Sequence, residues 1–200
     1  MTFPCANIRM RKAGYASIRI RQIGHTRQIE FIEGIIMRIE TERLNIIALT
    51  PEQLELWTHS IGELEKELLC SYKAEPMEGL FREIVCGQAE KAKKDPDNYL
   101  WHTFWFITKK TDHCVVGSVD FKDVPNSDGE VEIGYGLGRE FEHNGYMTET
   151  VQAFCNWALQ QDKVKHIIAE TDVDGALSQR ILTRCGFKEY ARNDTVWWRL

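Results

Sequence analysis

The chain has 200 residues, of which 43% are hydrophobic and 28% are charged. This is the composition of a globular protein with enough chain for one substantial core, and no apolar run approaches the roughly 20 residues that a membrane span needs. The six cysteines form no C-x-x-C pair and are irregularly spaced, which disfavours a zinc site or a disulfide framework and indicates a reduced, cytoplasmic protein.

The net charge of −5 is unevenly distributed along the chain. Residues 1–36 carry six Arg/Lys and two Glu, a net charge of +4, whereas residues 37–200 carry 19 Arg/Lys and 28 Asp/Glu, a net charge of −9. An acidic body argues against nucleic-acid binding. It either attracts a cationic substrate such as an amine or only keeps the protein soluble. We therefore expect no nucleic-acid partner and no membrane partner.

Residues 1–36 do not fit the rest of the sequence, because residues 1–29 contain no acid and show no clear apolar period. Three hypotheses compete: a disordered basic arm, an Arg-rich targeting presequence, or upstream sequence translated by mistake, with Met37 the true start. The third is favoured, because Glu33-Gly34 can be encoded by a purine-rich ribosome-binding element just before Met37. We predict a basic extension at residues 1–36, which the favoured hypothesis explains as an artefact of an upstream start, and one domain at 37–200.

The first half of the domain is predicted to be mainly helical. Thr50, Pro51 and Gln53 combine a Thr cap, a proline at the first helical position and a glutamine three residues after the cap, which is the pattern of a helix start. The elements predicted here are a strand at 38–49, a helical region from 51 to about 70 with a break near 61–62, and a helix at 76–94 that Asp95-Pro96 ends.

The second half of the domain alternates strands with two helices. The segment 99–108 is aromatic on both faces, which predicts a central strand, and the apolar residues of 151–159 recur at helical spacing. Gly186 is placed to end the last helix. The predicted elements are strands at 99–108, 114–122, 130–137, 165–171, 187–192 and 195–200, and helices at 146–161 and 176–185. This order predicts an α/β (α+β mixed) fold with one mixed sheet flanked by helices.

The stretch EFEHNGYMTET joins a predicted strand to the helix at 146–161. A helix N-terminus exposes unpaired N–H groups and a partial positive charge, and a glycine such as Gly145 lets the backbone approach a ligand closely. Together they favour an anion, most often a phosphate. A glycine in this position also serves as a simple turn.

Four motifs follow one another along the chain: IETERL (39–44), EIGYGL (132–137), EHNGYMTE (142–149) and SQRILTRCGF (178–187). In this order they resemble the Gcn5-related N-acetyltransferase (GNAT) superfamily, most closely its ribosomal-protein N-terminal acetyltransferase-like branch. The resemblance covers about residues 37–190 and implies a mostly antiparallel sheet of six to seven strands, splayed between strands 130–137 and 165–171. It also implies acetyl-CoA (coenzyme A) as cofactor, with the pantetheine arm between those strands.

The family's loop pattern, Gln/Arg-x-x-Gly-x-Gly/Ala, binds the pyrophosphate of coenzyme A through its amides. Here Gly145 is kept, whereas Glu142 and Met147 depart from the pattern and Asn144 stands where many relatives have Lys or Arg. Each lost exposed charge predicts an attraction weaker by up to about 1 kcal/mol. His143 either supplies a partial charge or is a solvated loop residue. The predicted cofactor-binding residues are Tyr135, Gly136, Leu137, His143, Asn144, Gly145, Tyr146, Met147 and Thr148.

Gly134 and Gly136 suit a bulge or a close backbone approach in strand 130–137, or else they only weaken an edge strand. Their position directly before the phosphate loop favours the functional interpretation. An amide freed there is predicted to donate to the thioester carbonyl as it becomes an oxyanion.

Direct attack of an amine on a thioester needs a base for the amine proton, and a carboxylate is suited to this. Glu132 and Glu170 are the candidates, and each is alternatively a solvent-facing residue. The resemblance implies that Ser178 contacts or protonates the cofactor sulfur, unless it only satisfies backbone groups at a helix start. Many family members have a tyrosine acid where this chain has Leu182, so that role is lost here.

The predicted function is transfer of an acetyl group from acetyl-CoA to a primary amine, in a small molecule or a protein N-terminus. The alternatives are a non-catalytic acyl-CoA-binding or interaction module, and one half of a homodimer that pairs through an exposed last strand, TVWWRL. No metal is expected, because adjacent Asp112, His113 and Cys114 cannot converge on one ion. Trp57, Trp101, Trp105 and Trp197 are predicted as core or as pocket walls.

Overall fold

The computed structural model describes residues 16–23, 26–33 and 37–200. Strands β1 (Ala16–Ile23) and β2 (Thr26–Glu33) pair with each other as an antiparallel two-stranded sheet, separate from the sheet of the main body. They belong to the predicted basic extension, whose other residues lie outside the described ranges. The hypotheses on the origin of that extension stay predictions.

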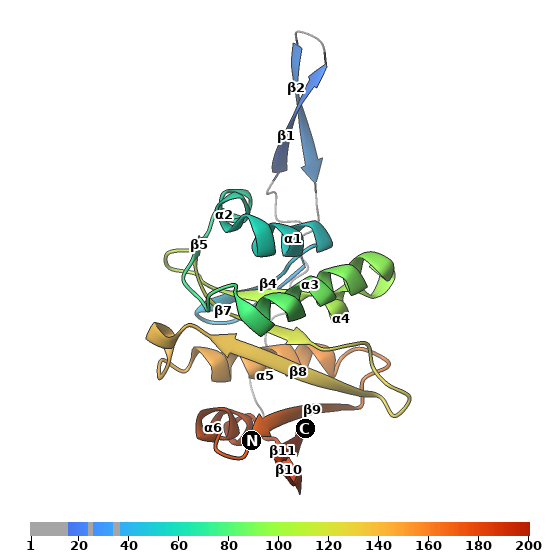
Figure 1. Ribbon diagram of the computed structural model, residues 1–200, viewed down its shortest axis with the longest axis vertical. Coiled ribbons are helices and arrows are strands. Elements are labelled where there is room, and N and C mark those ends of the chain that lie inside the picture. Colours follow the sequence, from blue (N-terminus) through green and yellow to red (C-terminus); the bar gives the residue numbers. More distant parts are fainter. Residues whose placement is uncertain (1–15, 24–25, 34–36) are drawn as a thin grey trace.

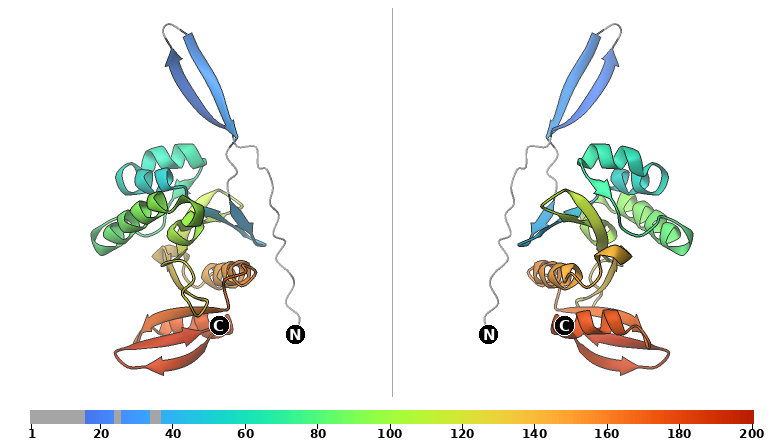
Figure 2. Two further views of the ribbon diagram at one scale, coloured as in Figure 1. Left: turned by 90° about the vertical axis from the view of Figure 1, so that its right-hand side faces the viewer. Right: turned by 90° about the vertical axis from the view of Figure 1, so that its left-hand side faces the viewer.

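Residues 37–200 form one open mixed sheet with helices on both faces (Figure 1). The strand order is β10-β11-β9-β8-β7-β6-β4-β3, with β5 beside β7, and the only parallel pairs in this sheet are β5–β7 and β8–β9. Figure 2 shows α1 and α3 on one side of the sheet and α5 on the other. In chain order the elements are β3 (Arg38–Glu40), β4 (Leu44–Ala48), α1 (Pro51–His59), α2 (Ile61–Leu68), β5 (Ser71–Tyr72), α3 (Gly79–Lys94), a 3-10 turn (Pro96–Asn98), α4 (Tyr99–His102), β6 (Phe104–Lys109), β7 (Cys114–Phe121), β8 (Glu130–Leu137), a second 3-10 turn (Arg139–Phe141), α5 (Tyr146–Ala158), β9 (His166–Asp172), α6 (Ala176–Arg184), β10 (Lys188–Arg192) and β11 (Thr195–Arg199).

The mixed, mostly antiparallel fold is confirmed, but the sheet has nine strands rather than six to seven. One strand was predicted at 38–49. Instead the chain turns at Thr41, whose hydroxyl accepts a hydrogen bond from the Leu44 amide at 3.0 Å, and β3 and β4 pair as a hairpin. The two-residue β5 was not foreseen.

Two further boundaries differ from the prediction. The segment 99–108 is not strand throughout: its first four residues form α4, and β6 begins only at Phe104. The central position predicted for this strand is confirmed, since β6 lies between β4 and β7. Helix α3 begins at Gly79 rather than at residue 76.

The prediction that the last strand is exposed and free to pair is wrong. Strand β11 lies between β9 and β10, so both of its edges are already hydrogen-bonded, and β10 is the strand at the edge. Trp198 is buried and its Nε1 donates to Thr171 Oγ1 at 3.0 Å. A homodimer stays a prediction, without this strand as its interface.

The two faces of the sheet carry separate cores. On the α5 side, Phe121 stacks on Phe154 at 4.5 Å between ring centroids, with Trp105 and Trp157 beside them. On the α1 and α3 side, Trp57 is the centre of an aromatic cluster. Each such buried aromatic side chain contributes roughly 1.5–3 kcal/mol. Trp57 and Trp105 are therefore core residues rather than pocket walls.

The predicted start of α1 is confirmed, because the Thr50 and Gln53 side chains and backbones form a reciprocal capping box. In the described part of the chain, no helix has the length and apolar character required to cross a membrane.

Candidate functional site

The splay predicted between strands 130–137 and 165–171 is present. Strand β8 pairs with β9 only through Glu130–Glu132, opposite His166–Ile168. Beyond this point β8 continues along β7 to Leu137, while β9 continues along β11 to Asp172. The sheet is therefore open between the second halves of β8 and β9.

The opening exposes backbone amides on β8. Lys122 N–H donates to Glu132 O at 3.0 Å, and Gly138 N–H donates to Val116 O at 2.8 Å. Bonded residues alternate along an antiparallel pair, so the even-numbered residues of this stretch bond to β7. The N–H groups of Tyr135 and Leu137 consequently face the gap from which β9 has withdrawn. The amide of Gly136, which pairs with Ser118, faces β7.

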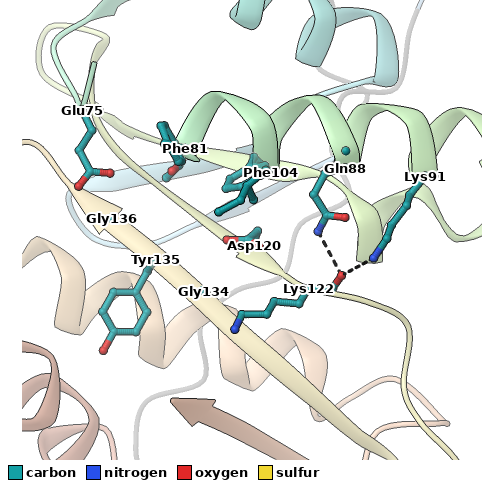
Figure 3. A pocket seen from close by; sticks show the side chains of 13 residues that line it. Glu75, Phe81, Gln88, Lys91, Phe104, Asp120, Lys122, Gly134, Tyr135 and Gly136 are labelled. Atoms are coloured by element: carbon teal, nitrogen blue, oxygen red, sulfur yellow. Dashed lines mark hydrogen bonds between the residues drawn. The ribbon is translucent and has the colours of Figure 1, made fainter. Parts of the chain in front are cut away.

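A cavity of about 540 Å³ lies over the face of β7 and β8 that α3 covers (Figure 3). Gly134 and Gly136 form part of its floor and have no side chains there. Figure 3 shows Glu75, Asp120 and Gln88 around this space, with α3 above it. The complete lining is Glu75, Phe81, Ile84, Gly87, Gln88, Lys91, Phe104, Ser118, Asp120, Lys122, Gly134, Tyr135 and Gly136.

Asp120 is the most buried charged residue of this cavity, with 6% of its surface exposed. It pairs with Gly134 across β7 and β8, and a Cβ atom built on that glycine would lie 2.7 Å from Asp120 Oδ1. Among residues 37–200 its carboxylate has no hydrogen-bond partner and no ion-pair partner. Burial raises the pKa of Asp120 to about 7, although the nearby Lys122 opposes this rise.

Glu75 is a second carboxylate in the cavity and comes from the segment between β5 and α3. Its side chain occupies the space that a Cβ atom on Gly136 would need. The backbone carbonyl of Glu75 accepts a hydrogen bond from the Tyr72 hydroxyl at 2.6 Å, which fixes this part of the segment. Burial raises the pKa of the Glu75 carboxyl.

The two carboxylates proposed from the sequence lie in different surroundings. Glu132 forms an ion pair with Lys122 at the last paired position of β8. Glu170 is exposed on β9 and accepts a hydrogen bond from Thr195 Oγ1 at 2.7 Å. Neither lines the cavity. Their roles stay predictions.

Helix α6 brings Ser178 next to the open half of β8. The Tyr135 hydroxyl donates to the Ser178 carbonyl at 3.4 Å, which links the two sides of the splay. Burial raises the pKa of Tyr135 above its usual value. Leu182, one turn further along α6, is fully buried, so its position serves the core.

The loop before α5 presents its amides without a side-chain cap. Gly145 is the N-cap residue, with φ of 77° in the left-handed region that glycine favours. Asn144 Nδ2 donates to the carbonyls of Phe141 and Glu142, at 3.1 and 3.0 Å, and so holds the loop in shape. The uncapped first turn of α5 thus retains free donors for an anion.

A positive charge reaches this loop from the turn between β3 and β4. Arg43 Nη1 donates to Asn144 O at 3.0 Å, and its guanidinium lies 4.7 Å from the centroid of the Tyr146 ring. Glu149 anchors the arginine through Nε at 2.7 Å and also accepts from Thr41 at 2.6 Å. The IETERL segment therefore brings an arginine beside the loop, and Glu149 shares its charge through the ion pair.

Three residues of this site escaped the sequence analysis: Arg43, Glu75 and Asp120. Arg43 lies in the IETERL motif, and this motif was the signal that could have pointed to it. Alternation in the strand CVVGSVDFK predicts that Asp120 and Ser118 share one face of the sheet. It cannot predict that Asp120 lies opposite Gly134, because this depends on the register between β7 and β8. No local signal marked Glu75.

The comparisons identify the family. Residues 43–188 match the family model described as an acetyltransferase (GNAT) domain. The chain belongs to this family. Its gap between β8 and β9, with an uncapped helix N-terminus at one end, fits a long ligand that has an anionic group, which is the form of coenzyme A.

Similar proteins agree with this assignment. An uncharacterized N-acetyltransferase, YjdG, from Bacillus subtilis is 35% identical over 83 residues, which are 42% of this chain and 49% of the relative. The chain therefore spans about half the length of this curated relative. A GNAT-family acetyltransferase from Bacillus anthracis has the same fold, with a TM-score of 0.58, 17% identity, and coverage of 82% of this chain and 98% of that one. The microcin C7 self-immunity acetyltransferase MccE, solved with acetyl-CoA and AMP, matches with a TM-score of 0.56 and 17% identity over 80% of this chain and 93% of that one.

Proposed function

We propose that this protein transfers an acetyl group from acetyl-CoA to a primary amine. The observation that carries the proposal is the coincidence of three features on one half of β8. The strand has parted from β9, its Tyr135 and Leu137 amides face the gap, and an unpartnered buried carboxylate, Asp120, lies above the strand on the cavity side.

The GNAT assignment and the acetyl-CoA complex of the similar MccE structure support acetyl-CoA as the acetyl donor. In this chain the gap would hold the pantetheine arm, and the loop before α5 would hold the pyrophosphate. The proposed contacts are the predicted ones, at Tyr135, Gly136, Leu137, His143, Asn144, Gly145, Tyr146, Met147 and Thr148, with Arg43 added.

Acetyl-CoA supplies an activated acetyl group, so that the amine nitrogen forms a bond to the acetyl carbon as the carbon–sulfur bond breaks. Asp120 acts as the base and accepts the proton that the amine loses. Its pKa of about 7 suits a base working near neutral pH. The free amides of Tyr135 and Leu137 donate to the carbonyl oxygen as negative charge develops there.

The residues proposed from the sequence have supporting roles in this scheme. Ser178, beside the open half of β8, supplies the proton or hydrogen bond for the departing sulfur. Glu132 acts through electrostatics, because its charge raises the pKa of Asp120 while its partner Lys122 lowers it. Glu170 remains a second candidate base on the far side of the gap.

One observation favours a second function, a non-catalytic acyl-CoA-binding module. Leu182 stands where the family often has a tyrosine acid, and it is packed in the core.

Two further proposals accompany both functions. The five cysteines in the described part of the chain are free thiols, which supports a reducing, cytoplasmic location; the acidic body supports an amine rather than a nucleic-acid partner.

Calorimetric titration with acetyl-CoA, followed by an assay of free thiol release with a panel of amines and peptide N-termini, tests the proposal. We expect binding, and turnover with at least one acceptor. Binding without turnover on any acceptor would favour the non-catalytic module. Absence of acetyl-CoA binding would contradict both functions.

A further inference from the structure

The cavity between α3 and β8 contains two carboxylates with no cationic partner. We infer that the acceptor is a short aliphatic diamine, with the amine to be acetylated at Asp120 and a second ammonium group at Glu75. This inference rests on the proposed acetyl transfer and adds the class of acceptor to it.

The spacing of the carboxylates follows from the strand beneath them. Asp120 lies against Gly134 and Glu75 against Gly136. Residues two apart on a strand face the same side and are about 7 Å apart. Two cationic groups joined by a short chain of methylenes match this separation, whereas a single ammonium would leave one carboxylate without a partner.

The cations that line the cavity are already engaged with other groups. Lys122 pairs with Glu132. Lys91 pairs with Asp123 at 3.1 Å and donates to the Lys122 carbonyl at 3.3 Å. The charges left without an internal partner in the described part of the cavity are therefore negative. Each is partly or wholly removed from water, so a bound cation would relieve the cost of its burial.

The remaining walls are suited to methylene groups. Phe81, Ile84 and Phe104 contribute apolar side chains, and Gly87 contributes none. A Cβ atom placed on Gly87 would meet nothing within 4 Å, so there is room along α3. The cavity of about 540 Å³ has the size of a site for a small molecule. An acceptor with a carboxylate near its amine would instead place like charges together at Glu75.

The test compares diaminobutane, aminobutanol and butylamine as acceptors, since these share one carbon chain and differ in the second group. For the parent protein we expect kcat/KM at least tenfold higher for diaminobutane than for aminobutanol. Glu75→Gln should reduce this preference to about twofold, mainly through KM. Glu78→Gln, which removes an exposed carboxylate on the same segment, should preserve it.

A binding measurement provides a readout that does not depend on turnover. Calorimetry with diaminobutane and the coenzyme A complex should show binding that Glu75→Gln weakens about tenfold and Glu78→Gln leaves unchanged. Equal use of all three amines, or an unchanged preference in Glu75→Gln, would overturn the inference. Turnover with a peptide N-terminus but not with diaminobutane would also overturn it, while leaving the proposed acetyl transfer standing.

Discussion

The two halves of β8 pair with different strands: Glu130–Glu132 pair with β9, and Ile133–Leu137 pair with β7. In the first half, the carboxylates of Glu130 and Glu132 form ion pairs with Arg199 and Lys122. In the second half the strand has lost β9. Its neighbouring carboxylates, Asp120 and Glu75, have no such partners among residues 37–200.

This difference separates structure from function along one strand. Leaving backbone amides unpaired lowers the stability of the folded state, and burying a carboxylate without a partner lowers it more. Both costs fall at one place, because Asp120 and Glu75 lie against Gly134 and Gly136 of the half of β8 that has the unpaired amides. Such local departures from good packing are expected where a site is kept ready for its ligands.

The largest expected effect comes from replacing a carboxylate by an amide, at Asp120 beside the second half of β8 and at Glu132 in the first half. Asp120→Asn should lower kcat/KM by about a hundredfold or more, because the base is removed. In the parent protein kcat/KM should rise with pH through about 7 as Asp120 loses its proton. Glu132→Gln should keep most of the activity and move this rise to lower pH, because Glu132 raises the pKa of Asp120. A severe loss in Glu132→Gln with little effect of Asp120→Asn would instead identify Glu132 as the base.

Thermal unfolding at two pH values provides the folding control for Asp120→Asn. The pKa of Asp120 is higher in the folded state than in the unfolded state, so its contribution to stability is present at low pH and is lost as pH rises to about 7. Asp120→Asn removes this loss. It should therefore be more stable than the parent protein at pH 8, with little difference near pH 4.

A smaller effect is expected from adding one methyl group to the second half of β8. The Cβ atom of Gly134→Ala would lie 2.7 Å from Asp120 Oδ1, so the carboxylate must move. We expect a roughly tenfold lower kcat/KM and a loss of stability of about 1–3 kcal/mol. The matched control is Gly62→Ala in α2, where a Cβ atom meets nothing within 4 Å. It should raise stability by up to about 1 kcal/mol without changing activity. Equal activity in both variants would contradict the close fit at Gly134.

The smallest effect is expected at the loop before α5. Arg43→Met removes the charge beside the Gly145 amides and the bond to the Asn144 carbonyl. Because these contacts are exposed, coenzyme A affinity should fall only about three- to tenfold. Arg38→Met provides the control, since Arg38 pairs with Glu40 instead. Calorimetric titration of both variants measures the difference; matching affinities would show that the amides alone suffice.

Much of this arrangement could be predicted from local sequence. The capping box at Thr50, the start of α5 after Gly145 and the end of α6 at Gly186 depend on a few adjacent residues. The splay was predicted through the family resemblance. Asp120 and Glu75 could not be found in this way, because their burial depends on the register between β7 and β8 and on a segment that returns over Gly136. The short helix α4 was missed because YLWH has the composition of a strand.

A crystal structure of the coenzyme A complex tests the central claim most directly, namely that acetyl transfer takes place at the second half of β8. The account predicts that the pantetheine arm lies between β8 and β9 beyond Glu132, with its thiol beside Tyr135–Leu137 and facing the cavity that contains Asp120. Coenzyme A bound elsewhere, with the gap between β8 and β9 closed, would contradict it.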